Sequence, residues 1–357
     1  MFIWKSQTSE EDLMRVMKSL LVPVALSWIT LSCLNNPLGP DVDTVTKDER
    51  ALAITYAPGD SASSVTGNVF LPSSGNNGSS ISWSTSTKSR ITDEGVVRRP
   101  AASSGDATVT LTATISKGKA REVKAFTLTV KDKSYTGNTM NAGTVTDIDG
   151  NVYWAVKIGS QVWTVQNLRT TKYNDGTEIP YAKDSATWVN LTTPGYCYYK
   201  NMTKPDSIKK YGVLYNWYAV NTKKLAPEGW HVPTDAEWKT LENYLIANGY
   251  NWDGTTSGNK IAKSLAAKTD WYTQTGLDVG TIGNDMSKNN RSGFLALPCG
   301  SRNTDGKFDF GGSANWWTAT EFNGSGGVAR NLYYDYEELF WNSNYKRCGF
   351  SVRLVKD

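Results

Sequence analysis

The strongest constraint on the fold of this chain is a capped helix signal that begins at Thr234. Glu237 follows three residues later, and this spacing predicts a capping box in which each side chain accepts a hydrogen bond from the other residue's backbone. Asn248 and Gly249 provide the left-handed residues that end the helix. Apolar residues recur between these ends at helical intervals and predict one buried face: Trp238, Leu241 and Leu245.

The residues around this helix start form a longer motif, Gly-Trp-His-Val-Pro-Thr-Asp-Ala-Glu-Trp, over residues 229–238. This string resembles the signature of the Fibrobacter succinogenes major paralogous domain, a family of bacterial secreted and lipid-anchored proteins. It is also similar to the Leu-Pro-Thr-x-Ala-Glu-Trp motif of formylglycine-generating enzymes. Both resemblances imply an α+β C-type-lectin-like fold.

Further segments resemble the first family in the same order along the chain, and together they extend over about two thirds of it. These segments are residues 147–151, 156–163, 166–168, 211–220, 293–298, 316–321 and 349–353. The resemblance therefore implies one C-type-lectin-like domain over residues 144–357.

Residues 45–132 have a different composition, rich in Ser, Thr, Gly and Val, with short alternating runs between turn signals. The run 107–115 alternates most regularly, and the turn at 117–119 leads into a second run, 123–130, so these residues predict a β-hairpin. The segment resembles the atypical bacterial immunoglobulin-like domains, which implies an all-β sandwich that acts as a spacer, with Trp83 in its core. A polar linker, residues 133–143, follows.

The N-terminal region reads as an export signal. Lys18 precedes an apolar run over residues 20–31 that is too short to span a bilayer, and the run ends at Ser32 and Cys33. This arrangement resembles a bacterial lipoprotein signal and implies that Cys33 carries lipid. The alternative is an ordinary cleaved signal with an incidental cysteine.

If the signal begins at Met17, residues 1–16 precede the translation start, although Met1 stays an open alternative. Residues 1–33 are then the upstream residues and the signal, and residues 34–44 form a tether rich in Asn, Pro and Gly. We therefore expect a lipid anchor in the membrane and a cell-envelope location, in the outer membrane, with the periplasmic and surface faces both open.

Composition excludes some partners. The net charge of +4 is spread without basic runs, so nothing indicates nucleic acid. Only three of the 14 tryptophans precede residue 150, which makes the C-terminal part a tryptophan-rich, loop-heavy domain of an extracellular kind.

The residues that bear chemistry predict neither catalysis nor a cofactor. His231 is the only histidine, so a zinc site with several imidazoles is excluded, and its place in the helix-start motif favours a packed or hydrogen-bonded role. The Asp-Ile-Asp-Gly-Asn string at 147–151 resembles part of a calcium loop, but its twelfth position is Ile158 instead of an acid. A turn that starts a hairpin is therefore favoured there, and no metal is expected.

The spacing of the cysteines differs from what one of the two resembled families requires. Formylglycine-generating enzymes use two cysteines close together to bind copper, whereas Cys299 and Cys348 are distant in this sequence. The lectin-like resemblance implies a disulfide between Cys299 and Cys348. In the paralogous family, a cysteine like Cys197 pairs with one just before the helix-start motif, where this chain has Ala226, so Cys197 is expected to be unpaired.

A late cluster of aromatic residues is the candidate ligand surface: Trp316, Trp317, Tyr333 and Trp341. Large rings of this kind form stacking platforms for glycans or protein partners, and the alternative is that they belong to the core. The calcium-binding strings of C-type lectins are absent from the sequence.

These observations favour a lipid-anchored cell-envelope protein with a non-enzymatic binding or adhesion module whose ligand is a glycan or a protein. Two alternatives stay open. One is an oxygen-dependent enzyme of the formylglycine-generating type, and the other is a structural tip subunit of a surface filament.

Overall fold

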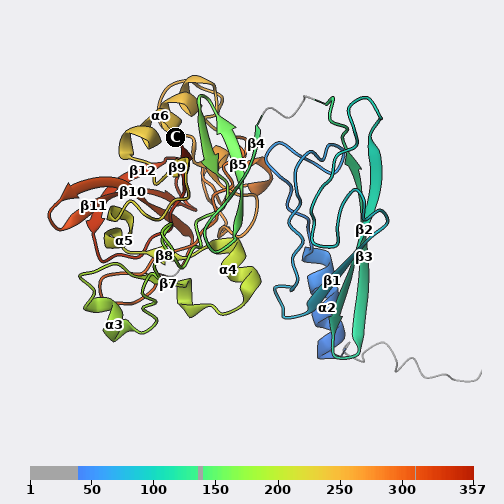
Figure 1. Cartoon of the computed structure of the whole chain (residues 1–357), viewed down its shortest axis with the longest axis horizontal. Coiled ribbons are helices and arrows are strands. Elements are labelled where there is room, and N and C mark those ends of the chain that lie inside the picture. Colours follow the sequence, from blue (N-terminus) through green and yellow to red (C-terminus); the bar gives the residue numbers. More distant parts are fainter. Residues whose placement is uncertain (1–38, 136–139, 310) are drawn as a thin grey trace, which may run out of the picture. The chain divides into compact units, whose positions relative to one another are not determined.

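The computed structural model describes residues 39–135, 140–309 and 311–357, and Figure 1 shows the order of its elements. The signal, Cys33 and the first part of the expected tether lie outside the described residues. The helices are α2 (Pro40–Ala51), α3 (Ser185–Val189), α4 (Pro205–Tyr211), α5 (Trp217–Asn221), α6 (Asp235–Ala247) and α7 (Ala262–Leu265), with two 3-10 helices, η1 (Tyr199–Asn201) and η2 (Met286–Lys288). The strands of the first domain are β1 (Ser80–Thr85), β2 (Ala107–Lys117) and β3 (Ala120–Val130).

Part of the tether prediction is wrong. Residues 40–44, which were assigned to the tether, form the start of helix α2. The signals for this helix are present in the sequence. Pro40 stands at its start, Asp41 and Asp43 lie in its first turn and Arg50 in its last turn, which is the charge order that the helix dipole favours.

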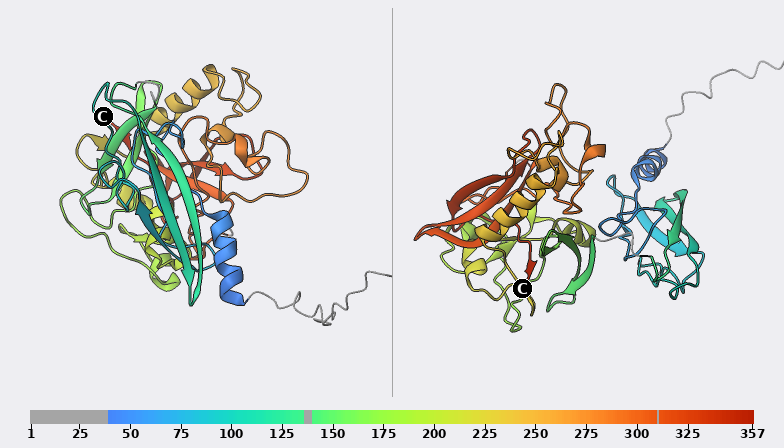
Figure 2. Two further views of the ribbon diagram at one scale, coloured as in Figure 1. Left: turned by 90° about the vertical axis from the view of Figure 1, so that its right-hand side faces the viewer. Right: turned by 90° about the horizontal axis from the view of Figure 1, so that it is seen from above.

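The first domain is built on the antiparallel sheet β1-β2-β3. The predicted hairpin is confirmed: β2 and β3 pair over their whole length and turn at Gly118, whose φ of 54° suits a residue without a side chain. The hairpin is long and twisted (Figure 2, left). The alternation predicted for β2 is present, and threonines lie between its buried residues on the other face. The buried residues are Val109, Leu111, Ala113 and Ile115.

The second layer of this domain is reduced to short pairings. Isolated bridges join Thr55 to Phe70 and Ile91 to Val97, and no further continuous sheet forms among the described residues 39–135. Buried residues of this layer still pack on β2 and β3 in one core: Ile54, Val65, Val69 and Ile91. Trp83 is only half-buried and contacts Phe126, so it lies at the margin of that core.

The C-terminal domain begins with β4, which starts at Asn141 inside the predicted linker, three residues before the expected boundary. Its strands are β4 (Asn141–Thr146), β5 (Val152–Ile158), β6 (Gln161–Thr164), β7 (Tyr196–Cys197), β8 (Leu214–Tyr215), β9 (Trp230–His231), β10 (Ser313–Asn323), β11 (Gly326–Tyr333), β12 (Phe340–Tyr345) and β13 (Val355–Lys356). The central sheet has the order β4-β5-β6-β13-β9, so the last strand of the chain lies between β6 and β9.

A second sheet, β10-β11-β12, packs against α6 (Figure 2, right). Helix α6 has the predicted capping box at Thr234 and Glu237 and the predicted buried face. Trp238 of α6 lies 4.9 Å from Trp163, 5.6 Å from Phe294 and 5.7 Å from Trp316, measured between ring centroids. Four large rings from distant parts of the sequence therefore form the centre of the core.

A second helix of this domain, α7, follows α6 and is short. Among the described residues, no helix has the length and apolar character that crossing a membrane requires.

Candidate functional site

The four aromatic residues of the predicted ligand surface do not form one platform. Trp316 and Trp317 are neighbours on β10, so their side chains point to opposite faces of the sheet, and both are fully buried. Trp316 joins the core beneath α6, and Trp317 joins a second core on the other face, with Phe350 at 4.5 Å. This part of the prediction is wrong, because strand alternation divides adjacent rings between two cores.

Tyr333 and Trp341 are also separated. Tyr333 is half-buried and contacts Tyr336 and Phe340, on the face of Trp317. Trp341 lies on the opposite face and is 45% exposed. Of the four predicted residues, Trp341 alone is an exposed ring that a ligand can reach.

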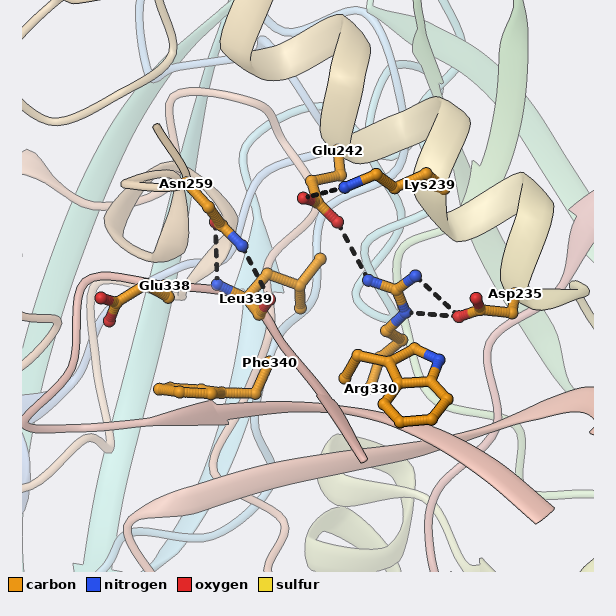
Figure 3. Close-up of a pocket in the computed structure, with 9 residues that line it drawn as sticks. Asp235, Lys239, Glu242, Asn259, Arg330, Glu338, Leu339 and Phe340 are labelled. Carbon is orange, nitrogen blue, oxygen red and sulfur yellow. Dashed lines mark hydrogen bonds and ion pairs between the residues drawn. The ribbon is translucent and has the colours of Figure 1, made fainter. Parts of the chain in front are cut away.

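Trp341 borders a pocket of about 520 Å³ between α6 and the start of β12. Figure 3 shows the side chains that line this pocket. The helix contributes three charged side chains, Asp235, Lys239 and Glu242, and β11 contributes Arg330. The rest of the lining comes from Asn259 and from the segment that enters β12, residues 338–341. A volume of this size is in the range of small-molecule and sugar sites.

Arg330 is the charged centre of this pocket, and only 3% of it is exposed. Its Nε and Nη2 atoms donate to Asp235 Oδ1 at 2.8 and 2.6 Å, and its Nη1 atom donates to Glu242 Oε2 at 3.0 Å (Figure 3). Lys239 donates to the other oxygen of Glu242 at 2.7 Å. A buried guanidinium held by two carboxylates is fixed in position, so the polar wall of the pocket is preorganised.

The sequence positions these groups by simple periodicity. Asp235, Lys239 and Glu242 are spaced by four and three residues, so they lie on one face of α6. Arg330 lies directly opposite Trp341 in the β11–β12 ladder, which places the exposed ring beside the ion-pair network. The spacing of the charges was visible in the sequence, but their pairing with Arg330 depends on how α6 packs on the sheet.

His231 has a structural role in this geometry. Its Nε2 atom lies 2.7 Å from Glu237 Oε1, and its Nδ1 atom lies 2.5 Å from Asp357 Oδ1. Partial burial lowers the pKa of His231, but the hydrogen bonds to Asp357 and Glu237 outweigh this effect and raise the pKa above 6.5. The imidazole therefore joins β9 to α6 and to the residue after β13.

The string at 147–151 folds as a turn, as favoured from the sequence. Asp147 accepts hydrogen bonds from the backbone N–H groups of Asp149 and Asn151, and its other oxygen accepts from the hydroxyl of Tyr153 at 2.5 Å. The carboxylate of Asp149 accepts from Thr171. These acceptors are occupied by the protein itself, and no group of three metal-ligating side chains occurs among the described residues.

The expected disulfide between Cys299 and Cys348 is absent, and both residues are free thiols. Cys348 packs in the core that contains Trp317 and Phe350, whereas Cys299 donates to the carbonyl of Leu297 at 3.1 Å.

The described thiols are buried in separate places. Cys299 accepts a hydrogen bond from Asn167 at 2.9 Å, and Cys197 lies in a small cluster with Trp188. Burial raises the pKa of Cys197 and of Cys299 to about 12, and that of Cys348 to about 11. At neutral pH these three groups are therefore protonated thiols.

Comparison with known families agrees with this architecture. Residues 156–356 match the Fibrobacter succinogenes major domain, which covers more than half of the chain. The chain belongs to this family. Residues 45–133 match the atrophied bacterial immunoglobulin domain, in accord with the reduced second layer of the first domain. No curated protein matches the chain.

The two matches together indicate a surface or adhesion-type module. In this member of the Fibrobacter succinogenes major domain family, the signature around residues 229–238 forms the start of α6. The signature therefore orders the core and one wall of the pocket.

Proposed function

We propose that this chain is a lipid-anchored cell-envelope protein whose C-terminal domain, of the C-type-lectin-like plan, binds a glycan without catalysis. The ligand site is the pocket between α6 and β12. The observation that carries the proposal is the half-exposed ring of Trp341 beside the buried ion pairs of Arg330.

The chemistry of the pocket suits a sugar. An exposed indole offers a flat apolar surface against which the C–H face of a sugar ring stacks. Asp235 and Glu242 supply carboxylate oxygens, and Lys239 supplies an ammonium group, within the same lining. Sugar hydroxyls both donate and accept, so they are complementary to a wall of mixed charge, and charge-assisted hydrogen bonds of this kind are strong and directional.

The rest of the chain supports a presenting role. The lipid at Cys33, the tether and the immunoglobulin-like spacer would hold the binding domain away from the membrane. The absence of an exposed, reactive thiol among the described residues favours binding over oxygen-dependent modification.

The test is binding of the purified full-length protein to an array of bacterial and host surface glycans. Trp341→Ala should weaken binding to the best glycan by about tenfold or more, as expected for an aromatic anchor. The matched control is Tyr181→Ala, since Tyr181 is 44% exposed and does not line the pocket. An array with no bound glycan, or equal loss in both variants, contradicts the proposal.

A further inference from the structure

The outer strand β12 has none of the features that usually protect a sheet edge. It pairs with β11 over all six residues without a register shift, and its sequence, Phe-Trp-Asn-Ser-Asn-Tyr, contains no charge, proline or glycine. Natural edge strands are commonly short, charged, bulged or interrupted by proline, because an open edge is a template for another strand.

Three other outer strands of the described sheets are protected. Strand β3 carries Arg121, Glu122 and Lys124. Strand β4 has a register shift between Asn141 and Thr144. On β10 the register shifts twice, and Ser351 pairs along its outer side. Strand β1 is also uncharged and regularly paired, but on its outer side Ile81 N–H donates to the carbonyl of Ser73.

The structure also marks where the open edge begins. Immediately before β12, the side-chain amide of Asn259 accepts from Leu339 N–H at 3.1 Å and donates to Leu339 C=O at 2.9 Å. Backbone groups of an antiparallel strand alternate in direction, so those of Trp341 and Ser343 point outward as those of Leu339 do. No backbone group of another described segment, apart from the paired strand β11, bonds to either residue.

The exposed sequence is self-complementary. Residues 341–345, Trp-Asn-Ser-Asn-Tyr, read as aromatic, amide, serine, amide and aromatic in both directions. Antiparallel pairing centred on Ser343 places Trp341 opposite Tyr345 of a second copy. These two side chains share one face of β12 and are 45% and 65% exposed, so pairing would bring an aromatic ring of each copy into cross-strand contact.

The opposite face carries a ladder of amides that ends at the open edge. Asn331 donates to Asn315 at 2.6 Å, and Asn342 donates to Asn331 at 2.8 Å. In the same antiparallel register, Asn344 of a second copy lies opposite Asn342 and extends this ladder across the new strand. Amide ladders of this kind stabilise stacked strands.

The charges at the two ends of β12 are complementary in this arrangement. Glu337 and Glu338 precede the strand and Arg347 follows it, whereas Lys346 is already paired with Glu321 of its own chain. Antiparallel pairing brings the acidic end of one copy beside the basic end of the other. The chain turns after β12, where Cys348 N–H bonds to Tyr345 C=O, so the second copy's strand ends before it reaches the segment covered by Asn259.

We propose that two copies of this chain form a symmetric dimer by antiparallel pairing of β12 with β12, with the two-fold axis at Ser343. The interface is isologous, because both copies use the same strand: Trp341 of each copy pairs with Tyr345 of the other. Tyr345 of the second copy would then lie beside Trp341, at the border of the pocket.

The first test uses charge at the axis. Sedimentation of the full-length protein in detergent, up to about 500 µM, should show a reversible dimer, since small interfaces are weak. Ser343→Lys and Ser343→Asp should each weaken the dimer by about tenfold or more at low salt, because like charges then face each other. An equal mixture of the two variants should restore association to within about threefold of the unmutated chain.

The second test uses a crosslink. Ser343→Cys should form a disulfide-linked dimer on mild oxidation, because the paired Cα atoms would lie about 5.5 Å apart. The matched control is Ser84→Cys on β1, an exposed serine of another outer strand. The unmutated chain measures any background from Cys33, and peptide mapping identifies the linked residues.

A monomer at every concentration overturns the proposal. So does a dimer that both charge variants leave intact, or a Ser343→Lys and Ser343→Asp mixture that stays monomeric while each variant is folded by circular dichroism. Glycan binding by a monomeric protein would leave the proposed function standing and remove the dimer.

Discussion

The role of a single residue in the C-terminal domain depends more on whether it is buried than on its chemical type. Cys299 and Cys348 belong to reactive or bridging residue types, yet each is enclosed and unbridged. Trp316 and Trp317 belong to ligand-stacking types, yet each contacts core rings on one side of a sheet. The position of a side chain relative to the sheet therefore decides its role.

The thiols give a test at this scale. We expect no alkylation of Cys197, Cys299 or Cys348 by iodoacetamide in the folded protein at neutral pH, because burial excludes the reagent and raises their pKa values. In denaturant without reductant, all three should react completely. Mass spectrometry measures both states. A requirement for reductant at Cys299 and Cys348 would show that they are bridged after all.

At the scale of elements, His231 connects three parts of the domain that are distant in sequence. It lies on β9, its ring contacts Glu237 of α6, and it also contacts Asp357 beyond β13. The same Glu237 closes the capping box with Thr234. One carboxylate thus caps the helix and fixes the imidazole, which explains the short spacing between these residues in the motif.

This connection predicts a pH dependence of stability. The pKa of His231 is raised on folding, so its contribution is complete below about 6.5, the unfolded value, and is lost as pH rises through the higher folded pKa. His231 is the only histidine, and below about pH 8 the thiols stay mostly protonated in the unfolded chain too. The free energy of unfolding, measured in denaturant between about pH 6 and 8, should decline with pH in the unmutated protein.

The control for this dependence is His231→Gln, which keeps a polar side chain but does not titrate. Its unfolding free energy should be lower than that of the unmutated protein near pH 6 and should change less across the same range. An identical pH profile in the two proteins would show that the imidazole does not carry the effect.

At the scale of the whole molecule, the order of parts is that of a presented domain. The family matches place an immunoglobulin-like segment at 45–133 before the Fibrobacter succinogenes major domain at 156–356. The export signal predicted from the sequence would precede both. Such an order suits a protein that is held at a membrane and exposes its last domain.

The anchor is tested by fractionation of cells that produce the chain. Cys33→Ala should release the protein from the membrane fraction, because the acyl chains supply the membrane affinity, at roughly 0.8 kcal/mol per buried methylene. Glycan binding by the released protein should be unchanged. Cys197→Ala is a suitable control, since that thiol is buried and not available for lipid. Membrane retention of Cys33→Ala would contradict the anchor.

The sequence by itself determined the local features of this protein. The capping box at Thr234, the buried face of α6 and the hairpin at Gly118 follow from contacts between residues close in the chain, and all three are present. The turn at Asp147 is of the same kind. Short-range hydrogen bonds and periodic burial are encoded by neighbouring residues, so a pattern is sufficient to predict them.

The tertiary structure alone decided which distant residues meet. Strand alternation sent Trp316 and Trp317 into different cores, and the packing of the domain left Cys299 and Cys348 unbridged. The packing of α6 on β11 brought Asp235 and Glu242 to Arg330 and left the adjacent Trp341 exposed. A shift of one residue in a strand reverses which face a side chain occupies, and the sequence of one strand does not contain that register.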